Sequence, residues 1–286
     1  MQVVCGVAEG RSHRAWGVRG AGVGRRILDV EVFVFWREAP SVAERISAVR
    51  GSGGSIDILW EDAESQGNSQ AAMRATQGKV GQLWPYTDEE WSEHYYLEDL
   101  SIGVSGFSAA TVEAWVGDLN QGVASDISEM VASTLLARAP ITGEEVVADW
   151  VSRLEPYPQA LALTVIERWL QPDEQWWSVD VLAARNDRPA FDAVLVGMQR
   201  RLIRLLLAAN GKYLVDPRPK WAQRLIEACE YQPRDCATRL QQVRTAPPGE
   251  AASLLQELFG ETLEMLSHRF PTIDVQPVRE LIRLRR

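Results

Sequence analysis

Two acidic residues, Asp29 and Glu31, are the side chains best suited to chemistry in this chain. They lie in residues 27–36, a run of β-branched and aromatic residues that predicts a strand. Residues two apart on a strand share a face, and two adjacent carboxylates repel unless a cation lies between them. Mg²⁺ or Mn²⁺ accepts such oxygen ligands, so the pair predicts a metal site. The alternative is an edge strand that shows polar residues to solvent. In either case, we expect Val30, Val32 and Val34 to face a core.

The segment before this strand combines glycine with arginine. Glycines let a backbone bring its N–H groups close to phosphate oxygens, and the arginines make this segment basic within an acidic protein. A phosphate-binding turn is therefore one interpretation, and a solvated, flexible arm is the other. The residues concerned are Gly17, Gly20, Gly22 and Gly24 with Arg11, Arg14, Arg19, Arg25 and Arg26.

Two kinds of sequence pattern divide the chain near residue 120. The first part alternates strand-like segments with short helices, and further strands are expected at 56–61, 80–86 and 95–104. Ser108 is expected to cap a helix that ends near Leu119. After residue 124, apolar residues recur with helical spacing throughout. We expect helices at 124–138, 143–154, 158–170, 174–186, 189–209, 218–230, 233–243, 250–269 and 275–284. The predicted fold is therefore α+β, with a mixed-sheet domain at 1–120 and an all-helical bundle at 121–286.

Charge and composition narrow the classes of function. The 286 residues carry a net charge of −9, which argues against nucleic acid as a partner. The three cysteines predict no disulfide framework, and the first ten residues lack a basic run, so we expect a cytoplasmic protein without a signal peptide. No apolar run is long enough for a membrane span. The sequence does not indicate an oligomeric state.

A glycine-rich turn followed by an acidic pair on a strand resembles the nucleotidyltransferase fold of polymerase-β-type enzymes. The chain as a whole resembles a poorly characterised bacterial branch of nucleotidyltransferase-like proteins with a helical C-terminal domain. Four segments carry this second likeness: DVEVFVFWRE (29–38), LWPYTDEEWSEHYYLEDLSIGVS (83–105), EQWWSVDVLAARND (174–187) and LLLAANGKYLVDPRPKW (205–221).

The resemblance assigns roles to particular residues. It implies that Asp29 and Glu31 hold Mg²⁺ or Mn²⁺, and that Gly17, Val18, Arg19 and Gly22 lie against the nucleotide phosphates. Two positions depart from the family pattern. Val18 stands where the family has a serine, and Gly103 lies near the place of its third carboxylate, for which Glu98 or Asp99 could substitute.

The helical part contributes a polar and aromatic cluster at 210–221. On the strength of the resemblance, Lys212 or Lys220 would neutralise nucleotide phosphates and Tyr213 or Trp221 would stack on a base. The alternative is an ordinary turn between helices.

The leading hypothesis is a Mg²⁺-dependent nucleotidyltransferase that moves a nucleoside monophosphate from ATP or another NTP. Its acceptor would be a hydroxyl of a small, aminoglycoside-like molecule or of a protein. A catalytically degenerate nucleotide-binding or ligand-binding protein is the first alternative, motivated by Val18 and Gly103. A toxin–antitoxin-type interaction protein is the second.

Overall fold

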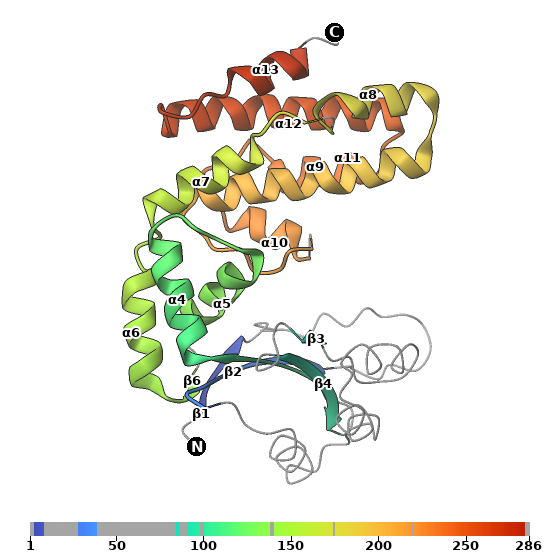
Figure 1. The fold of residues 1–286 in the computed structure, drawn as a ribbon. Coiled ribbons are helices and arrows are strands. Elements are labelled where there is room, and N and C mark those ends of the chain that lie inside the picture. The colour runs from blue at the N-terminus through green and yellow to red at the C-terminus, as the bar shows by residue number, and fades with distance from the viewer. Residues whose placement is uncertain are drawn as a thin grey trace. The chain divides into compact units, whose positions relative to one another are not determined.

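A computed structural model describes the parts of the chain that form its sheet and its helices. The described residues are 3–8, 28–38, 84–85, 91–97, 100–137, 140–173, 175–218 and 220–283. They form a mixed sheet, contributed chiefly by the first part of the chain, and a long series of helices after it (Figure 1). The predicted α+β class, with its mixed sheet and its helical C-terminal part, is confirmed at this level.

The chain divides into two compact units. The first consists of Met1–Val116 and Thr134–Arg153, and the second of Gly117–Ser133 and Leu154–Arg286. This division differs from the single boundary expected after residue 120. Residues 134–153 belong to the first unit because α6 (Glu144–Leu154) packs on the sheet there. In that contact the rings of Phe35 and Trp150 meet edge to face, with their centroids 5.5 Å apart.

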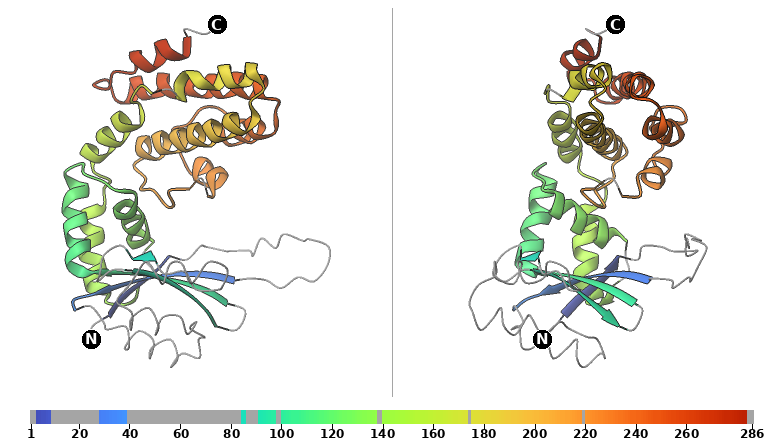
Figure 2. Two further views of the ribbon diagram at one scale, coloured as in Figure 1. Left: turned by 45° about the vertical axis from the view of Figure 1, so that its right-hand side comes forward. Right: turned by 90° about the vertical axis from the view of Figure 1, so that its right-hand side faces the viewer.

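The sheet of the first unit has six strands in the order β3-β4-β5-β2-β1-β6, and it forms a single curved layer (Figure 2). Its one parallel pair among the described strands is β2 with β5, while β1 lies antiparallel on the other side of β2. The strands are β1 (Val3–Ala8), β2 (Leu28–Trp36), β3 (Trp84–Pro85), β4 (Trp91–Leu97), β5 (Leu100–Ser108) and β6 (Pro140–Thr142). The strand that carries the acidic pair is therefore an inner strand and has a neighbour on each side.

The C-terminal half of β2 packs its aromatic side chains into the core. Phe33 and Phe35 are 6% and 0% exposed, whereas Val32 and Val34 are only half-buried. Val32 and Val34 lie on the face of β2 that also carries the buried Trp36, and Val30 lies outside the described side chains. The larger rings bury more apolar area, and Trp150 covers their face of the sheet. Positions 29 and 31 belong to the same alternating set as Phe33 and Phe35.

The strand expected at 95–104 is instead the meeting point of two strands. β4 ends at Leu97, β5 begins at Leu100, and these two residues pair in an antiparallel register. The apolar alternation on both sides of Glu98 and Asp99 made the segment look continuous, although two consecutive acids are poor strand formers. The strand expected at 56–61 lies outside the described residues.

The helix that follows β5 begins as predicted. The backbone N–H of Thr111 donates to Ser108 Oγ at 3.0 Å, and α4 extends over Ala109–Asn120. α5 (Asp126–Leu136) follows it. The boundary between the two compact units passes through both helices.

The second unit is built around α9 (Arg188–Ala209), whose last nine residues are all buried. Helices α7, α8, α10 and α12 pack against α9, as Figure 1 shows. Asp187 caps its start by accepting a hydrogen bond from the backbone of Ala190, and Gly211, with φ +63°, follows its end. The remaining helices are α7 (Gln159–Trp169), α8 (Gln175–Arg185), α10 (Ala222–Glu227), α11 (Cys236–Thr245), α12 (Pro248–Arg269) and α13 (Gln276–Arg283).

Most of the expected helices are confirmed to within a few residues. The exception is 218–230, where α10 covers only Ala222–Glu227. Proline at 217 and 219 excludes a regular helix there, and Trp221 takes a left-handed conformation with φ +58° immediately before α10.

Candidate functional site

The candidate site is the first half of β2, where Asp29 and Glu31 occupy alternate positions of an inner strand. On the parallel neighbour β5, Ser101 pairs with Asp29 and Gly103 pairs with Glu31. On the antiparallel neighbour β1, Ala8 pairs with Glu31. Residues directly paired across strands belong to the same face of a sheet, so these five positions share one face.

The neighbours of the acidic pair are all small. Glycine, alanine and serine occupy the paired positions, and the next row along β2 likewise pairs Phe33 with Gly6 and Ser105. Paired carboxylates are also the donor set that Mg²⁺ and Mn²⁺ accept, so the residues present fit a divalent cation.

The register also locates the expected third carboxylate position. The residues of β5 beside the acidic pair are Ser101 and Gly103, so β5 supplies no carboxylate there. Glu98 and Asp99 lie outside the described residues. Leu100, which follows them, pairs with Leu28, which precedes Asp29.

The predicted phosphate-binding turn lies outside the described residues. Gly17, Val18, Arg19 and Gly22 fall in residues 9–27, between Ala8 at the end of β1 and Leu28 at the start of β2. Ala8, the last described residue before this segment, pairs with Glu31.

In the second unit, Tyr213 belongs to the core instead of an open surface. Its ring is 4% exposed and lies 4.7 Å from the ring of Tyr157, and its hydroxyl donates to the backbone oxygen of Leu154 at 2.9 Å. Burial raises its pKa above the ordinary value. A ring held in this way cannot stack on a base without leaving the core, so the structure does not support the role expected for Tyr213.

The two lysines of the 210–221 cluster differ in their surroundings. Lys212 is half-buried, while Lys220 is 49% exposed and pairs with Asp216, its Nζ 3.4 Å from Oδ2. Asp216 also accepts a 2.8 Å hydrogen bond from the backbone N–H of Arg218. Burial alone would raise the pKa of Asp216, but the bonds from Arg218 and the nearby charge of Lys220 hold it below its usual value. Trp221 is 65% exposed and remains accessible.

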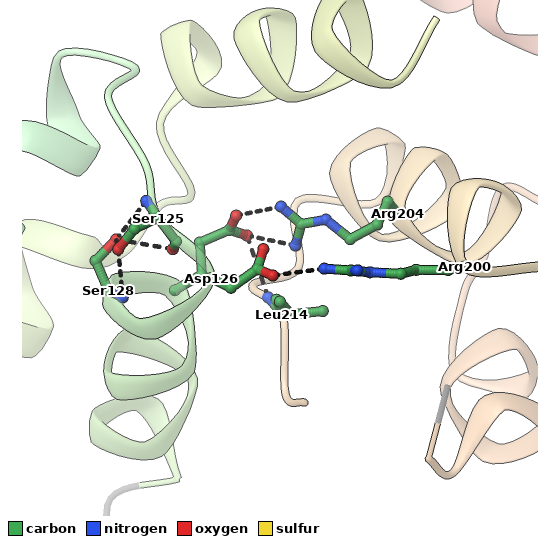
Figure 3. A network of polar contacts seen from close by, with 7 residues as sticks. Ser125, Asp126, Ser128, Arg200, Arg204 and Leu214 are labelled. Atoms are coloured by element: carbon green, nitrogen blue, oxygen red, sulfur yellow. Dashed lines mark hydrogen bonds and ion pairs between the residues drawn. The ribbon is translucent and has the colours of Figure 1, made fainter. Parts of the chain in front are cut away.

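A network of ion pairs that sequence reasoning missed fixes this segment to α5 (Figure 3). Arg204 of α9 pairs with Glu129 of α5, and a Glu129 oxygen also accepts the backbone N–H of Leu214 at 3.2 Å. Beside them, Arg200 Nη2 lies 2.6 Å from an Asp126 oxygen. The signal was three arginines, at 200, 201 and 204, among the otherwise apolar residues that end this helix.

The buried thiols of the second unit are unsuited to nucleophilic catalysis. Burial raises the pKa of Cys229 to about 11 and that of Cys236 to about 12. Both thiols therefore stay protonated at neutral pH, and the thiolate is the reactive form. Among the described side chains, no group of three or more His, Cys, Asp or Glu residues is arranged to hold a metal ion. None of the helices described is both long and apolar enough to cross a lipid bilayer.

Two comparisons with known proteins gave no relative. The chain matches no protein-family model, and a search of the curated proteins found no similar sequence. The sequence resemblance and the register of the sheet are the observations that bear on function.

Proposed function

We propose that the chain is a nucleotidyltransferase that uses Mg²⁺ or Mn²⁺ to transfer a nucleoside monophosphate from an NTP to a hydroxyl group. The observation that carries this proposal is the register of β2. It pairs Asp29 and Glu31, on an inner strand, with Ser101, Gly103 and Ala8. Both carboxylates therefore belong to one strand, and their paired neighbours on β1 and β5 are small residues.

The roles of the chain's own residues follow from this arrangement. Asp29 and Glu31 would bind the cation and fix its position against the sheet. When bound, a divalent cation neutralises phosphate charge and stabilises the departure of pyrophosphate. The arginines of 9–27 would add positive charge for the triphosphate, since that segment joins β1 to β2. Glu98 or Asp99 would accept the proton of the attacking hydroxyl, because Leu100 beside them pairs with Leu28 beside Asp29.

The acceptor class follows from charge. A chain with a net charge of −9 attracts cations over long range, which favours a cationic, aminoglycoside-like molecule or a protein over a polyanion.

The test is label transfer from an α-labelled NTP to a panel of aminoglycosides and proteins. The wild-type chain should transfer label only with Mg²⁺ or Mn²⁺, and Asp29→Asn or Glu31→Gln should abolish transfer. Glu144→Gln, which removes an exposed acid at the start of α6, is the matched control and should retain activity. Full activity in the Asp29 variant would refute the mechanism.

A second candidate function, nucleotide binding without transfer, is favoured by one observation. Ser101 and Gly103 occupy the positions of β5 beside the acidic pair, so that strand lacks the third carboxylate of the family pattern. Calorimetry separates the two functions. Metal-dependent NTP binding that needs Asp29 and Glu31, with no transfer to any acceptor, would favour the binding protein.

A further inference from the structure

The indole of Trp169, the last residue of α7, belongs to a cluster of buried hydrogen-bond donors in the second unit. Arg200 and Arg204 are one turn apart on α9, and their guanidinium carbons lie 5.3 and 5.7 Å from the centroid of the Trp169 ring. Both arginines therefore pack against the same aromatic ring and connect α9 to α7.

Tyr157 reaches this cluster from the segment before α7. Its ring centroid lies 4.7 Å from that of Tyr213, and the next residue, Leu214, donates its backbone N–H to Glu129. Burial raises the pKa of the Tyr157 hydroxyl, the nearby charge of Glu129 also raises it, and the charge of Arg204 lowers it. The hydroxyl of Tyr157 therefore lies near the ion pair of Glu129 and Arg204.

Four polar atoms of this cluster have no hydrogen-bond partner among the residues that the structure describes. All four are buried, and they are Trp169 Nε1, Tyr157 Oη, Arg200 Nε and Arg204 Nε. Tryptophan and arginine nitrogens can only donate, so the three nitrogens all need an acceptor. Buried polar groups without a protein partner are costly, and ordered water ordinarily satisfies them.

The charges of the cluster select a neutral ligand. Arg204 pairs with Glu129 and Arg200 with Asp126, so two positive charges already meet two negative ones (Figure 3). Because the side chains of Glu129 and Arg204 are 1% and 3% exposed, an added anion would place an unbalanced charge away from water. Glu129 accepts three hydrogen bonds, from Arg204 and Leu214, and a carboxylate has room for about four. A water molecule can accept from the unpartnered nitrogens and donate to this carboxylate.

We infer that the cluster around Trp169 is a binding site for ordered water, which accepts the indole N–H and bonds to the hydroxyl of Tyr157. Such water would link α7 to α9 through hydrogen bonds that the two helices do not make directly. The inference is independent of the proposed nucleotidyl transfer, because every residue of the cluster belongs to the second unit.

Nuclear magnetic resonance of the full chain, labelled with ¹⁵N-tryptophan, tests the site. Cross-relaxation between indole protons and water detects a long-lived bound water, and the signal of Trp169 is identified by its loss in Trp169→Phe. Trp150 is the control, because its indole is also buried and its Nε1 donates to Glu113 at 2.9 Å. We expect contact with long-lived water at Trp169 and none at Trp150. A Trp169 indole proton without that contact would overturn the inference.

Tyr157→Phe tests whether the hydroxyl takes part. If water bonds to it, removal should lower the folding equilibrium constant about fivefold in urea denaturation, the equivalent of one net hydrogen bond. An equilibrium constant that is unchanged or higher in the variant would exclude the hydroxyl from the site.

A change of anion distinguishes water from a bound ion. At constant ionic strength, the wild-type chain should be equally stable in chloride and in gluconate. Stability that rises specifically with chloride would overturn the assignment of water and identify an anion site instead.

Discussion

Glu129 and Arg204 form a buried ion pair that joins α5 to α9 in the helical unit. Their side chains are 1% and 3% exposed, and Arg204 Nη1 lies 3.1 Å from Glu129 Oε2. The same carboxylate accepts the backbone N–H of Leu214. The pair therefore neutralises two charges that have almost no access to water, and it holds the segment after α9 in place.

Removal of either partner should strongly destabilise the chain. Glu129→Ala or Arg204→Ala leaves one buried charge without its partner, which costs about 3–5 kcal/mol of unfolding free energy. Equilibrium denaturation in urea measures this loss. Asp192→Ala is the control, because Arg188 and Asp192 form a pair that is about half exposed and should contribute less than about 1 kcal/mol. Equal losses in the buried and exposed pairs would contradict this account.

A second prediction concerns acid sensitivity in the first unit. Hydrogen bonds from Arg153 and from Trp150 Nε1, the latter 2.9 Å from an oxygen of Glu113, lower the pKa of Glu113 to about 2. A carboxyl group with a depressed pKa stabilises the fold above its ordinary pKa, and this stabilisation is lost as pH falls through the folded value. The contribution of Glu113 should therefore be complete above pH 4.5 and disappear as pH approaches 2.

Comparison with Glu113→Gln isolates this effect. The difference in thermal stability between wild type and variant should be largest above pH 5 and shrink as the pH is lowered. Because the Glu113 side chain is 55% exposed, added salt should reduce the difference. A difference that stays constant between pH 6 and pH 2 would show that the hydrogen bonds do not favour the ionised form.

The sequence predicted the helices well because their signals are local. Ser108 at the start of α4 and Asp187 before α9 are polar caps next to apolar residues with helical spacing, and both act as caps. The strands β1 and β6 were missed because they are short and are defined by pairing with distant residues, such as Cys5 with Thr142. Such long-range pairing leaves no periodic pattern in a segment of three to six residues.

The candidate site was predictable only in part, for the same reason. Asp29 and Glu31 follow from alternation along one strand, which a sequence displays directly. That Ser101 and Gly103 lie beside the acidic pair depends on the register of β5 against β2, which becomes visible only once these two strands are paired. Tyr213 was a candidate binding residue because it lies in the polar and aromatic cluster at 210–221. The contacts that bury it come from Tyr157 and Leu154, more than fifty residues earlier in the chain.

A third prediction tests the structural role of Tyr213. Tyr213→Phe removes the hydroxyl that bonds to Leu154 and leaves a buried backbone oxygen without that donor, at a cost of about 1 kcal/mol. Urea denaturation should show this loss, whereas calorimetric titration with an NTP and Mg²⁺ should give an unchanged affinity. A stable variant with weakened nucleotide binding would instead restore the role expected from the sequence.

A fourth prediction concerns the backbone of Trp221. This residue has φ +58° and ψ +19°, a left-handed conformation that costs a residue with a Cβ atom about 1–2 kcal/mol. Trp221→Gly and Trp221→Ala lose the same indole ring, which is mostly exposed, so the comparison between them isolates the backbone. Glycine avoids the left-handed cost but loses more entropy on folding, and the Gly variant should be more stable than the Ala variant by roughly 0.5–1 kcal/mol. Paired denaturation curves measure the difference, and an Ala variant as stable as the Gly variant would show that Trp221 leaves this conformation in solution.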